Sequence, residues 1–241
     1  MLKKDKIYSK AQKKISPFVF DKRVARVFDD MISRSVPGYS DIVQMCGVLA
    51  TQFVQSQTRV YDLGCSLGAA SRAVLQAIPN MRYELLAVDS SSAMIEKARV
   101  LLKGRYQASV LLDCSSVEEV GIKNASFVMF NFVLQFIEKK KRLPLLQKIY
   151  AGLNPGGALV LSEKIDFSTK QEREVQRKLH EEFKKSKGYS GLEISQKRTA
   201  LEKVLVPESL VAHEARLKKA GFENVYVWFR CFNFVSLLAV K

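Results

Sequence analysis

The chain has 241 residues, of which 47% are hydrophobic and 26% carry a charged side chain. This length predicts one domain with a substantial core, and no apolar run approaches the length of a membrane span, so we expect no membrane association. The formal net charge is +15, but the basic residues form runs without interleaved aromatic side chains that could stack on bases. We therefore interpret the charge as a solvated basic surface, with a site for an anionic small molecule or weak RNA contact as the alternatives.

The N-terminal segment, residues 1–17, is rich in lysine but lacks the apolar stretch of a signal peptide. We expect this segment to be a mobile basic tail, and residues 18–241 to form a single domain of a cytoplasmic protein. Asp21 then caps a predicted helix that ends near Ser33, and a second helix is predicted at 40–53. The turn between the two helices is either a simple connector or a lid over a ligand pocket.

The cysteine and histidine residues give no metal signature. The four cysteines are Cys46, Cys65, Cys114 and Cys231, and they lack a C-x-x-C or other metal-like spacing. Such cysteines are most simply reduced thiols in a cytoplasmic chain. His180 and His213 fall on separate predicted helices, where we expect ordinary surface or cap positions. No metal cofactor is predicted.

Residues 60–70 predict a buried strand, a glycine turn and the N-terminus of a helix. Asp62 ends the strand, at the edge where open α/β sheets bind their ligands. Gly64 allows the backbone to turn and to approach a ligand closely, and the helix that follows Gly68 offers unpaired N–H groups. A plain turn is the alternative for these glycines taken alone.

Asp89 favours the ligand-binding interpretation. It follows an apolar run at 85–88 and lies 21 residues beyond Gly68, where a carboxylate can accept hydrogen bonds from both hydroxyls of a ribose. The spacing of Gly64 and Gly68 is not the G-x-G-x-x-G of dinucleotide-binding folds. It resembles instead the first motif of the class I S-adenosylmethionine (SAM) methyltransferases, which predicts a SAM-type pocket.

Helices and strands alternate through the middle of the chain and predict a parallel sheet covered on both faces. The expected strands lie at 58–63, 83–88, 108–112, 125–130 and 158–162, with helices at 69–77, 93–102 and 139–153. Three polar helices with no strand between them are expected at 168–219, followed by an antiparallel hairpin at 224–229 and 232–240. The predicted fold is α/β, a class I methyltransferase (Rossmann-like) fold with a mostly parallel seven-stranded sheet, in which 18–55 and 168–219 are helical cap elements.

Four longer blocks resemble the carboxy-S-adenosylmethionine synthases. The blocks are residues 35–40, 61–70, 152–164 and 192–198, and the resemblance covers about residues 20–239. It implies a reaction that converts SAM and prephenate into carboxy-SAM and phenylpyruvate, with no methyl group passed to a nucleophile. It also implies a homodimer without a metal, whose product feeds a separate carboxymethyltransferase that makes 5-carboxymethoxyuridine at the tRNA wobble position. No stable binding of the enzyme itself to nucleic acid is expected.

The same resemblance implies a set of ligand contacts. They are Tyr39, Gly64, Cys65, Ser66, Asp89, Ser90, Asp113, Cys114, Asn131 and Arg198. In the family's mechanism prephenate loses carbon dioxide and hydroxide, the methyl group of SAM loses a proton to give a sulfonium ylide, and the ylide captures the carbon dioxide. Arg198 would hold the new carboxylate through its planar guanidinium. The released hydroxide can serve as the base, so no protein general base is assigned.

The sequence departs from the family pattern mainly at the expected adenine edge. Ser90 stands where an asparagine is expected and Cys114 where an aliphatic residue is expected, and the segment from Asp113 to Asn131 is longer. Asp113 is either an acceptor for the adenine amine or a plain turn residue. Arg34 and Lys197 are candidates for holding prephenate, but the resemblance does not fix that site.

Two other functions stay open on the sequence. One is an ordinary SAM-dependent methyltransferase that acts on RNA or a small molecule, although the local motifs for exocyclic amines and for pyrimidine C5 are absent from the chain. The other is a catalytically silent SAM-binding adaptor that holds tRNA on its basic surface, for which RNA affinity would fall steeply with salt.

Overall fold

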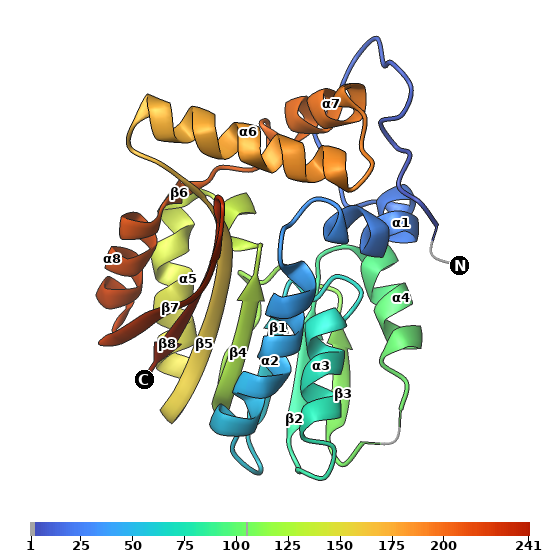
Figure 1. Ribbon diagram of the computed structural model, residues 1–241. Coiled ribbons are helices and arrows are strands. Elements are labelled where there is room, and N and C mark those ends of the chain that lie inside the picture. The colour runs from blue at the N-terminus through green and yellow to red at the C-terminus, as the bar shows by residue number, and fades with distance from the viewer. Residues whose placement is uncertain (1–2, 105) are drawn as a thin grey trace.

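The computed structural model describes residues 3–104 and 106–241, and these fold around one mixed β-sheet (Figure 1). The strands of the main path, in spatial order, are β3 (Ser109–Asp113), β2 (Glu84–Val88), β1 (Arg59–Leu63), β4 (Ala125–Asn131), β5 (Leu153–Asp166), β8 (Phe234–Val240) and β7 (Asn224–Cys231). The pairs β3–β2, β2–β1, β1–β4 and β4–β5 are parallel, whereas β8 is antiparallel to both β5 and β7. The predicted class I methyltransferase fold is confirmed in this topology.

The main path has the seven predicted strands, but the prediction of no strand within residues 168–219 was wrong. A two-residue strand, β6 (Glu208–Ser209), pairs in parallel with Ile165 and Asp166 at the end of β5, which brings the strands of the described residues to eight. Two residues are too few to leave an alternating pattern in a sequence. The strand β6 forms because β5 continues to Asp166, beyond its predicted end at residue 162, and its last residues offer unpaired backbone groups to Glu208 and Ser209.

Helices cover both faces of the sheet. On one face lie α2 (Tyr39–Phe53), α3 (Ala69–Ala77) and α4 (Ser92–Leu101), and on the other lie α5 (Lys139–Gly152) and α8 (Leu210–Ala220) (Figure 1). Neighbouring residues of β1 point into different cores, because side chains alternate along a strand. Val60 packs with the α2–α3–α4 core and Tyr61 with the α5–α8 core. The helices predicted at 40–53, 69–77, 93–102 and 139–153 each begin and end within one residue of the observed bounds.

A helical cap lies over the carboxyl ends of the parallel strands. It consists of α1 (Lys22–Ser33), α6 (Lys170–Ser186) and α7 (Gly191–Leu201) (Figure 1). Asp21 caps α1 as predicted, since its side chain accepts from the backbone N–H groups of Arg23 and Val24. Ser190 and Glu193 form a reciprocal capping box at the start of α7. These caps fix where the polar helices begin above the sheet.

Residues 3–17, for which we expected a mobile tail, lie against this cap. The Tyr189 hydroxyl donates to Asp5 Oδ2 across 2.6 Å, and Asp5 is 2% exposed. Gln196 of α7 accepts from the backbone N–H of Gln12 and donates to the carbonyl of Tyr8. Within 3–104 and 106–241, no helix is both long and apolar enough to cross a membrane.

Candidate active site

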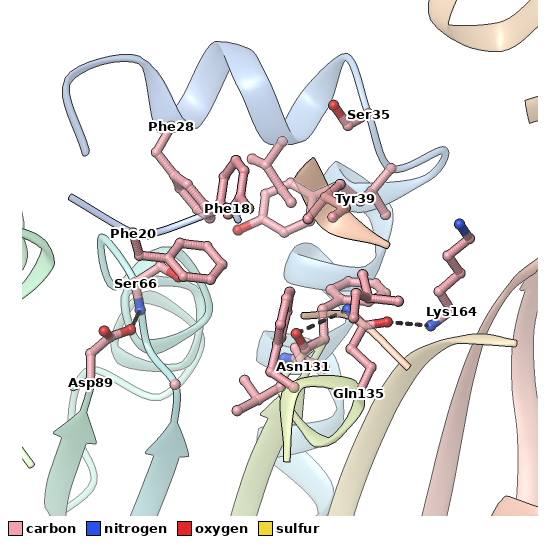
Figure 2. A pocket seen from close by; sticks show the side chains of 18 of the residues that line it. Phe18, Phe20, Phe28, Ser35, Tyr39, Ser66, Asp89, Asn131, Gln135 and Lys164 are labelled. Atoms are coloured by element: carbon pink, nitrogen blue, oxygen red, sulfur yellow. Dashed lines mark hydrogen bonds between the residues drawn. The ribbon is translucent and has the colours of Figure 1, made fainter. Parts of the chain in front are cut away.

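A cavity of about 450 Å³ lies between the cap and the carboxyl ends of β1, β2, β4 and β5 (Figure 2). This is the edge at which open α/β sheets bind ligands, and the volume is in the ordinary range for a small-molecule site. The turn at 34–39 helps to close it, since Ser35, Val36 and Tyr39 line the cavity. Phe18, Phe20 and Phe28 form an aromatic wall beneath α1.

The loop after β1 approaches the cavity with its backbone. Gly64 has φ +78°, and a Cβ at this position would lie 2.2 Å from Val133 Cγ2, so only glycine fits without displacing the neighbouring chain. Cys65 and Ser66 follow it along the cavity wall, and Ser66 also has a positive φ of 50°. This close approach of backbone suits a ligand that needs N–H and carbonyl groups around a charged tail.

Asp89 is held as a fixed hydrogen-bond acceptor at the end of β2. Its Oδ2 accepts from the backbone N–H of Ser66 across 2.9 Å (Figure 2). Its Oδ1 accepts from the backbone N–H of Ser91 at the same distance. Burial raises the pKa of Asp89 above its usual value, and the two backbone donors oppose that rise. Each carboxylate oxygen keeps acceptor capacity, so the group can still receive two hydroxyl donors.

Asp62, which ends the β1 motif, lines the cavity, and one oxygen of its carboxylate is hydrogen-bonded to α3. It is 3% exposed, and its Oδ2 accepts from both the backbone N–H and the hydroxyl of Ser71 on α3, across 3.1 and 2.6 Å. Burial raises the pKa of Asp62 to about 6. The hydrogen bonds between Asp62 and Ser71 hold α3 against β1, the strand that precedes the glycine loop.

Asn131 is oriented by partners on two sides. The Ser162 hydroxyl donates to Asn131 Oδ1 across 2.6 Å, and Asn131 Nδ2 donates to Cys46 Sγ across 3.6 Å. Beside it, the rings of Tyr39 and Phe132 lie 6.5 Å apart between centroids. The end of β4 therefore presents a fixed amide next to an aromatic surface.

The structure brings most of the predicted contact residues together. Lining the cavity are Tyr39, Gly64, Cys65, Ser66, Asp89, Ser90 and Asn131. Among the residues described, Asp113, Cys114 and Arg198 are not part of the lining. The guanidinium of Arg198 instead binds Glu181 across 2.5 Å and lies 3.7 Å from Glu202.

The loop between β3 and β4 reaches the cavity later than predicted. Asp113 accepts from the neighbouring Ser115 hydroxyl across 2.9 Å, and Cys114 is exposed. Ser116, Val117 and Glu118 line the cavity in their place. The physical reason is the length of this loop, which carries the chain outward before it returns to the cavity. The longer spacing between Asp113 and Asn131 was the sequence signal that a different part of this loop lines the cavity.

Sequence reasoning named Lys197 as a candidate for holding prephenate, but it missed that Lys164, Lys184 and His180 lie on the same side of the cavity. Lys164 on β5, Lys184 on α6 and Lys197 on α7 all line it, and so does His180. His180 lies on the cap helix α6 but not at the surface, since this side chain is 6% exposed. Its Nε2 lies 2.8 Å from the Ser35 carbonyl, and burial together with the nearby lysines drives the pKa of His180 far down, so the ring is neutral.

His213 is also buried, at 1% exposure, which corrects its predicted surface position as well. It lies on α8, away from the cavity lining. Within the described part of the chain, no group of three or more His, Cys, Asp or Glu side chains could hold a metal ion.

The cavity thus has an acidic end at Asp89, a backbone-lined middle at Gly64–Ser66 and a cationic end at the three lysines. Figure 2 shows Asp89 and Lys164 at its two ends. A nucleoside with a charged amino-acid tail fits the first two parts, through its ribose hydroxyls and through the tail. The residues present therefore fit SAM.

Comparison with known proteins identifies the family. A family model described as a methyltransferase domain matches residues 60–157. A carboxy-S-adenosyl-L-methionine synthase from Trichlorobacter lovleyi is 52% identical over 242 residues, which cover 99% of this chain and 99% of that protein. The chain belongs to the carboxy-S-adenosyl-L-methionine synthase family. The protein of that name from Escherichia coli O1:K1 is 50% identical over 243 residues, which cover 100% of this chain and 98% of its relative. The resemblance inferred from the sequence blocks is confirmed, and the chain is a transferase of this synthase family.

Solved structures show the same fold at low sequence identity. Human N-acetylserotonin methyltransferase in complex with SAM has a TM-score of 0.61 and 16% identity, over 91% of this chain and 55% of that one. This chain therefore spans about half the length of the human enzyme. A SAM-dependent methyltransferase from Leishmania major has a TM-score of 0.60 and 13% identity, over 92% and 79% of the two chains. Family membership and fold together support SAM as the ligand of this synthase.

Proposed function

We propose that this synthase converts SAM and prephenate into carboxy-SAM and phenylpyruvate. The observation that carries the proposal is a single cavity with a ribose-type acid, Asp89, at one end and cationic side chains at the other. An ordinary methyl acceptor gives no reason for several lysines beside the reacting group. A second substrate that carries carboxylates, such as prephenate, explains why lysines gather there.

The reaction balances without an external oxidant or reductant. Prephenate loses carbon dioxide, and the electron pair left behind expels hydroxide as the ring becomes aromatic. The hydroxide takes a proton from the methyl group of SAM and becomes water. The carbon freed of that proton bonds to carbon dioxide and gives carboxy-SAM. The protein has to hold the two substrates side by side and exclude bulk water, which would carry the carbon dioxide away.

The SAM contacts that we propose are the predicted residues that line the cavity, with Asp89 on the ribose and the backbone of Gly64–Ser66 around the amino-acid tail. Ser116 and Val117 replace Asp113 and Cys114 at the adenine edge in this proposal, because they line the cavity. Arg198 stays proposed as the partner of the product carboxylate on the family resemblance. That contact requires its guanidinium to exchange Glu181 for the ligand.

Turnover tests the proposal directly. Purified protein incubated with SAM and prephenate should yield carboxy-SAM and phenylpyruvate in equal amounts, measured by mass spectrometry and by absorbance. Omission of prephenate should abolish both products. Methylation of RNA or of a small acceptor without prephenate would contradict the proposal and favour an ordinary methyltransferase.

The setting of the reaction is also proposed from the family. We expect a cytoplasmic homodimer that passes carboxy-SAM to a tRNA carboxymethyltransferase for the wobble uridine and does not itself bind tRNA stably. Light scattering should give twice the chain mass of 27.2 kDa. Addition of the purified protein to labelled tRNA at physiological salt should leave the mobility of the tRNA unchanged.

A further inference from the structure

Three lysines from separate parts of the chain meet at one end of the cavity. Lys164 comes from β5, Lys184 from α6 and Lys197 from α7. Lys197 is held in place, with its Nζ 2.9 Å from Ser35 Oγ and 3.8 Å from Asp5 Oδ2. For the Nζ atoms of Lys164 and Lys184, residues 3–104 and 106–241 provide neither a hydrogen-bond acceptor nor a carboxylate within ion-pair distance. Two amines therefore face a shared cavity, and the nearby carboxylates of Glu181, Glu202 and Asp166 do not form ion pairs with them within the described chain.

This arrangement is unfavourable while the cavity is empty. Desolvation and the charges of Lys164 and Lys197 lower the pKa of Lys184 to about 7, and burial lowers the pKa of Lys164 as well. Like charges that are partly removed from water repel one another more strongly than on the open surface. An anion between the ammonium groups would remove this repulsion and supply the missing counterion.

The surroundings of the lysines suit a ring that carries acid groups. Phe132 and Phe234 meet edge to face, with centroids 6.1 Å apart, and the neutral ring of His180 lies 4.9 Å from Phe234. Lys164 stands directly opposite Phe234 in the β5–β8 register. An apolar wall next to two free amines matches a carbocycle with carboxylate substituents.

The sheet order separates this end from the nucleoside end. Asp89 follows β2, Lys164 belongs to β5, and β1 and β4 lie between them (Figure 2). Three strand spacings amount to about 14 Å. Gly64 and Asn131 occupy the intervening strand ends. A nucleoside anchored at Asp89 can therefore extend its tail along the edge while a second molecule occupies the lysine end.

We propose that Lys164 and Lys184 bind the carboxylates of the second substrate, a cyclic dicarboxylate, with Lys197 as a positioning residue behind them. This inference rests on the proposed function for the identity of that substrate as prephenate. Lys197 positions the site through Ser35, to whose hydroxyl it donates. The carbonyl of Ser35 lies beside His180 Nε2 and helps to keep the imidazole ring next to Phe234.

Two variants and a matched control test the site. Lys164→Met and Lys184→Met keep the aliphatic stems and remove the charges, whereas Lys185→Met removes a neighbouring amine that is exposed and paired with Glu182 across 2.7 Å. Each protein is saturated with S-adenosylhomocysteine and titrated with prephenate by calorimetry. The dissociation constant for prephenate should rise by about tenfold or more in the first two variants and stay within about twofold in Lys185→Met. The dissociation constant for S-adenosylhomocysteine should be unchanged in all three.

Several outcomes would overturn the proposal. Unchanged prephenate affinity in both cavity variants, or no prephenate binding by the unmodified protein, would mean that the lysines do not form its site. Equal weakening of prephenate and S-adenosylhomocysteine would mean that they hold the nucleoside's tail instead. Lys184→Arg is the charge-conserving control that separates loss of the charge from a folding defect, and it should keep most of the prephenate affinity. Failure of the proposed function is separate: it would appear as lysine-dependent prephenate binding with no carboxy-SAM formed by the unmodified protein.

Discussion

The carboxylate of Asp89 accepts a hydrogen bond from the backbone N–H of Ser66 across 2.9 Å, which ties the end of β2 to the glycine loop after β1. One side chain thus defines two walls of the cavity. A second backbone donor, from Ser91, holds its other oxygen. The acid proposed to recognise the ribose is therefore preorganised before any ligand arrives.

Replacement of this acid should weaken SAM and carboxy-SAM alike. Asp89→Ala removes a charged acceptor for ribose hydroxyls that both ligands share, a loss of roughly 1.5–3 kcal/mol in binding free energy. Calorimetric titration of both ligands measures it. Glu96→Ala, at an exposed acid on the neighbouring helix α4, is the control and should leave both affinities unchanged. Unchanged affinity in Asp89→Ala would remove this residue from the site.

Gly64→Ala should damage both stability and ligand binding. The new Cβ would meet Val133 at 2.2 Å, and φ +78° is unfavourable for alanine, so we expect a loss of about 1–3 kcal/mol in unfolding free energy. SAM affinity should fall as the loop shifts. The control is Gly121→Ala, where an added Cβ has no neighbour within 4 Å among the described residues. Urea unfolding that gives equal stability for both variants would show that the loop relaxes without strain.

Arg198→Leu should weaken carboxy-SAM binding far more than SAM binding if its guanidinium holds the added carboxylate. Because the side chain is 39% exposed, we expect the lower part of the range of roughly 2–5 kcal/mol for a broken charge pair. Arg198→Lys should recover only part of the loss, since an ammonium lacks the planar fork. Arg177→Leu is the matched control, because Arg177 also binds Glu181, across 3.0 Å. Equal weakening of both ligands by Arg198→Leu would assign it to the fold or to the amino-acid tail.

Prephenate affinity should depend on pH through Lys184. The charged groups around it are Lys164, Lys197, Arg198 and Glu181, and the neutral His180 lies on the same helix. The pKa of Lys184 is about 7 without ligand, and a bound carboxylate raises it, so binding takes up a proton above that pH. Affinity measured at pH 7, 8 and 9 should therefore fall as pH rises. Lys184→Met should flatten this profile, and an equally steep profile in that variant would exclude Lys184 as its source.

His213 should make the protein sensitive to acid. Neither ring nitrogen has a hydrogen-bond partner within residues 3–104 and 106–241, and burial beside Arg216 lowers its pKa to about 4. The unfolded chain binds this proton near pH 6.5 and the folded chain does not, so stability is present above pH 6.5 and is lost as pH falls toward 4, by up to about 3 kcal/mol. Urea unfolding at pH 7, 6, 5 and 4.5 should show the loss. His213→Leu should reduce the slope, leaving the contribution of His180, which has the same sign.

The sequence by itself determined the helices, strand ends and turns that depend on residues close together in the chain. The helix at 69–77 has the predicted bounds, Asp89 stands at the end of its strand, and the glycine loop enters the cavity as expected. Apolar periodicity, capping residues and glycine turns act over a few residues, so they can be read without a fold. The long matched blocks gave the family for the same reason, because they preserve local sequence.

Only the tertiary structure decided which distant side chains share an environment. Lys164, Lys184 and Lys197 belong to three elements, and nothing in their spacing predicts that they meet at one cavity with His180 buried among them. Ser116 lines the cavity and Asp113 does not, because of the path that the loop between β3 and β4 takes. The strand β6 forms only because β5 offers it a pairing partner. Burial, charge proximity and strand pairing depend on what packs against a residue. Chain neighbours do not specify those contacts, so the cationic end of the site becomes visible only in the folded molecule.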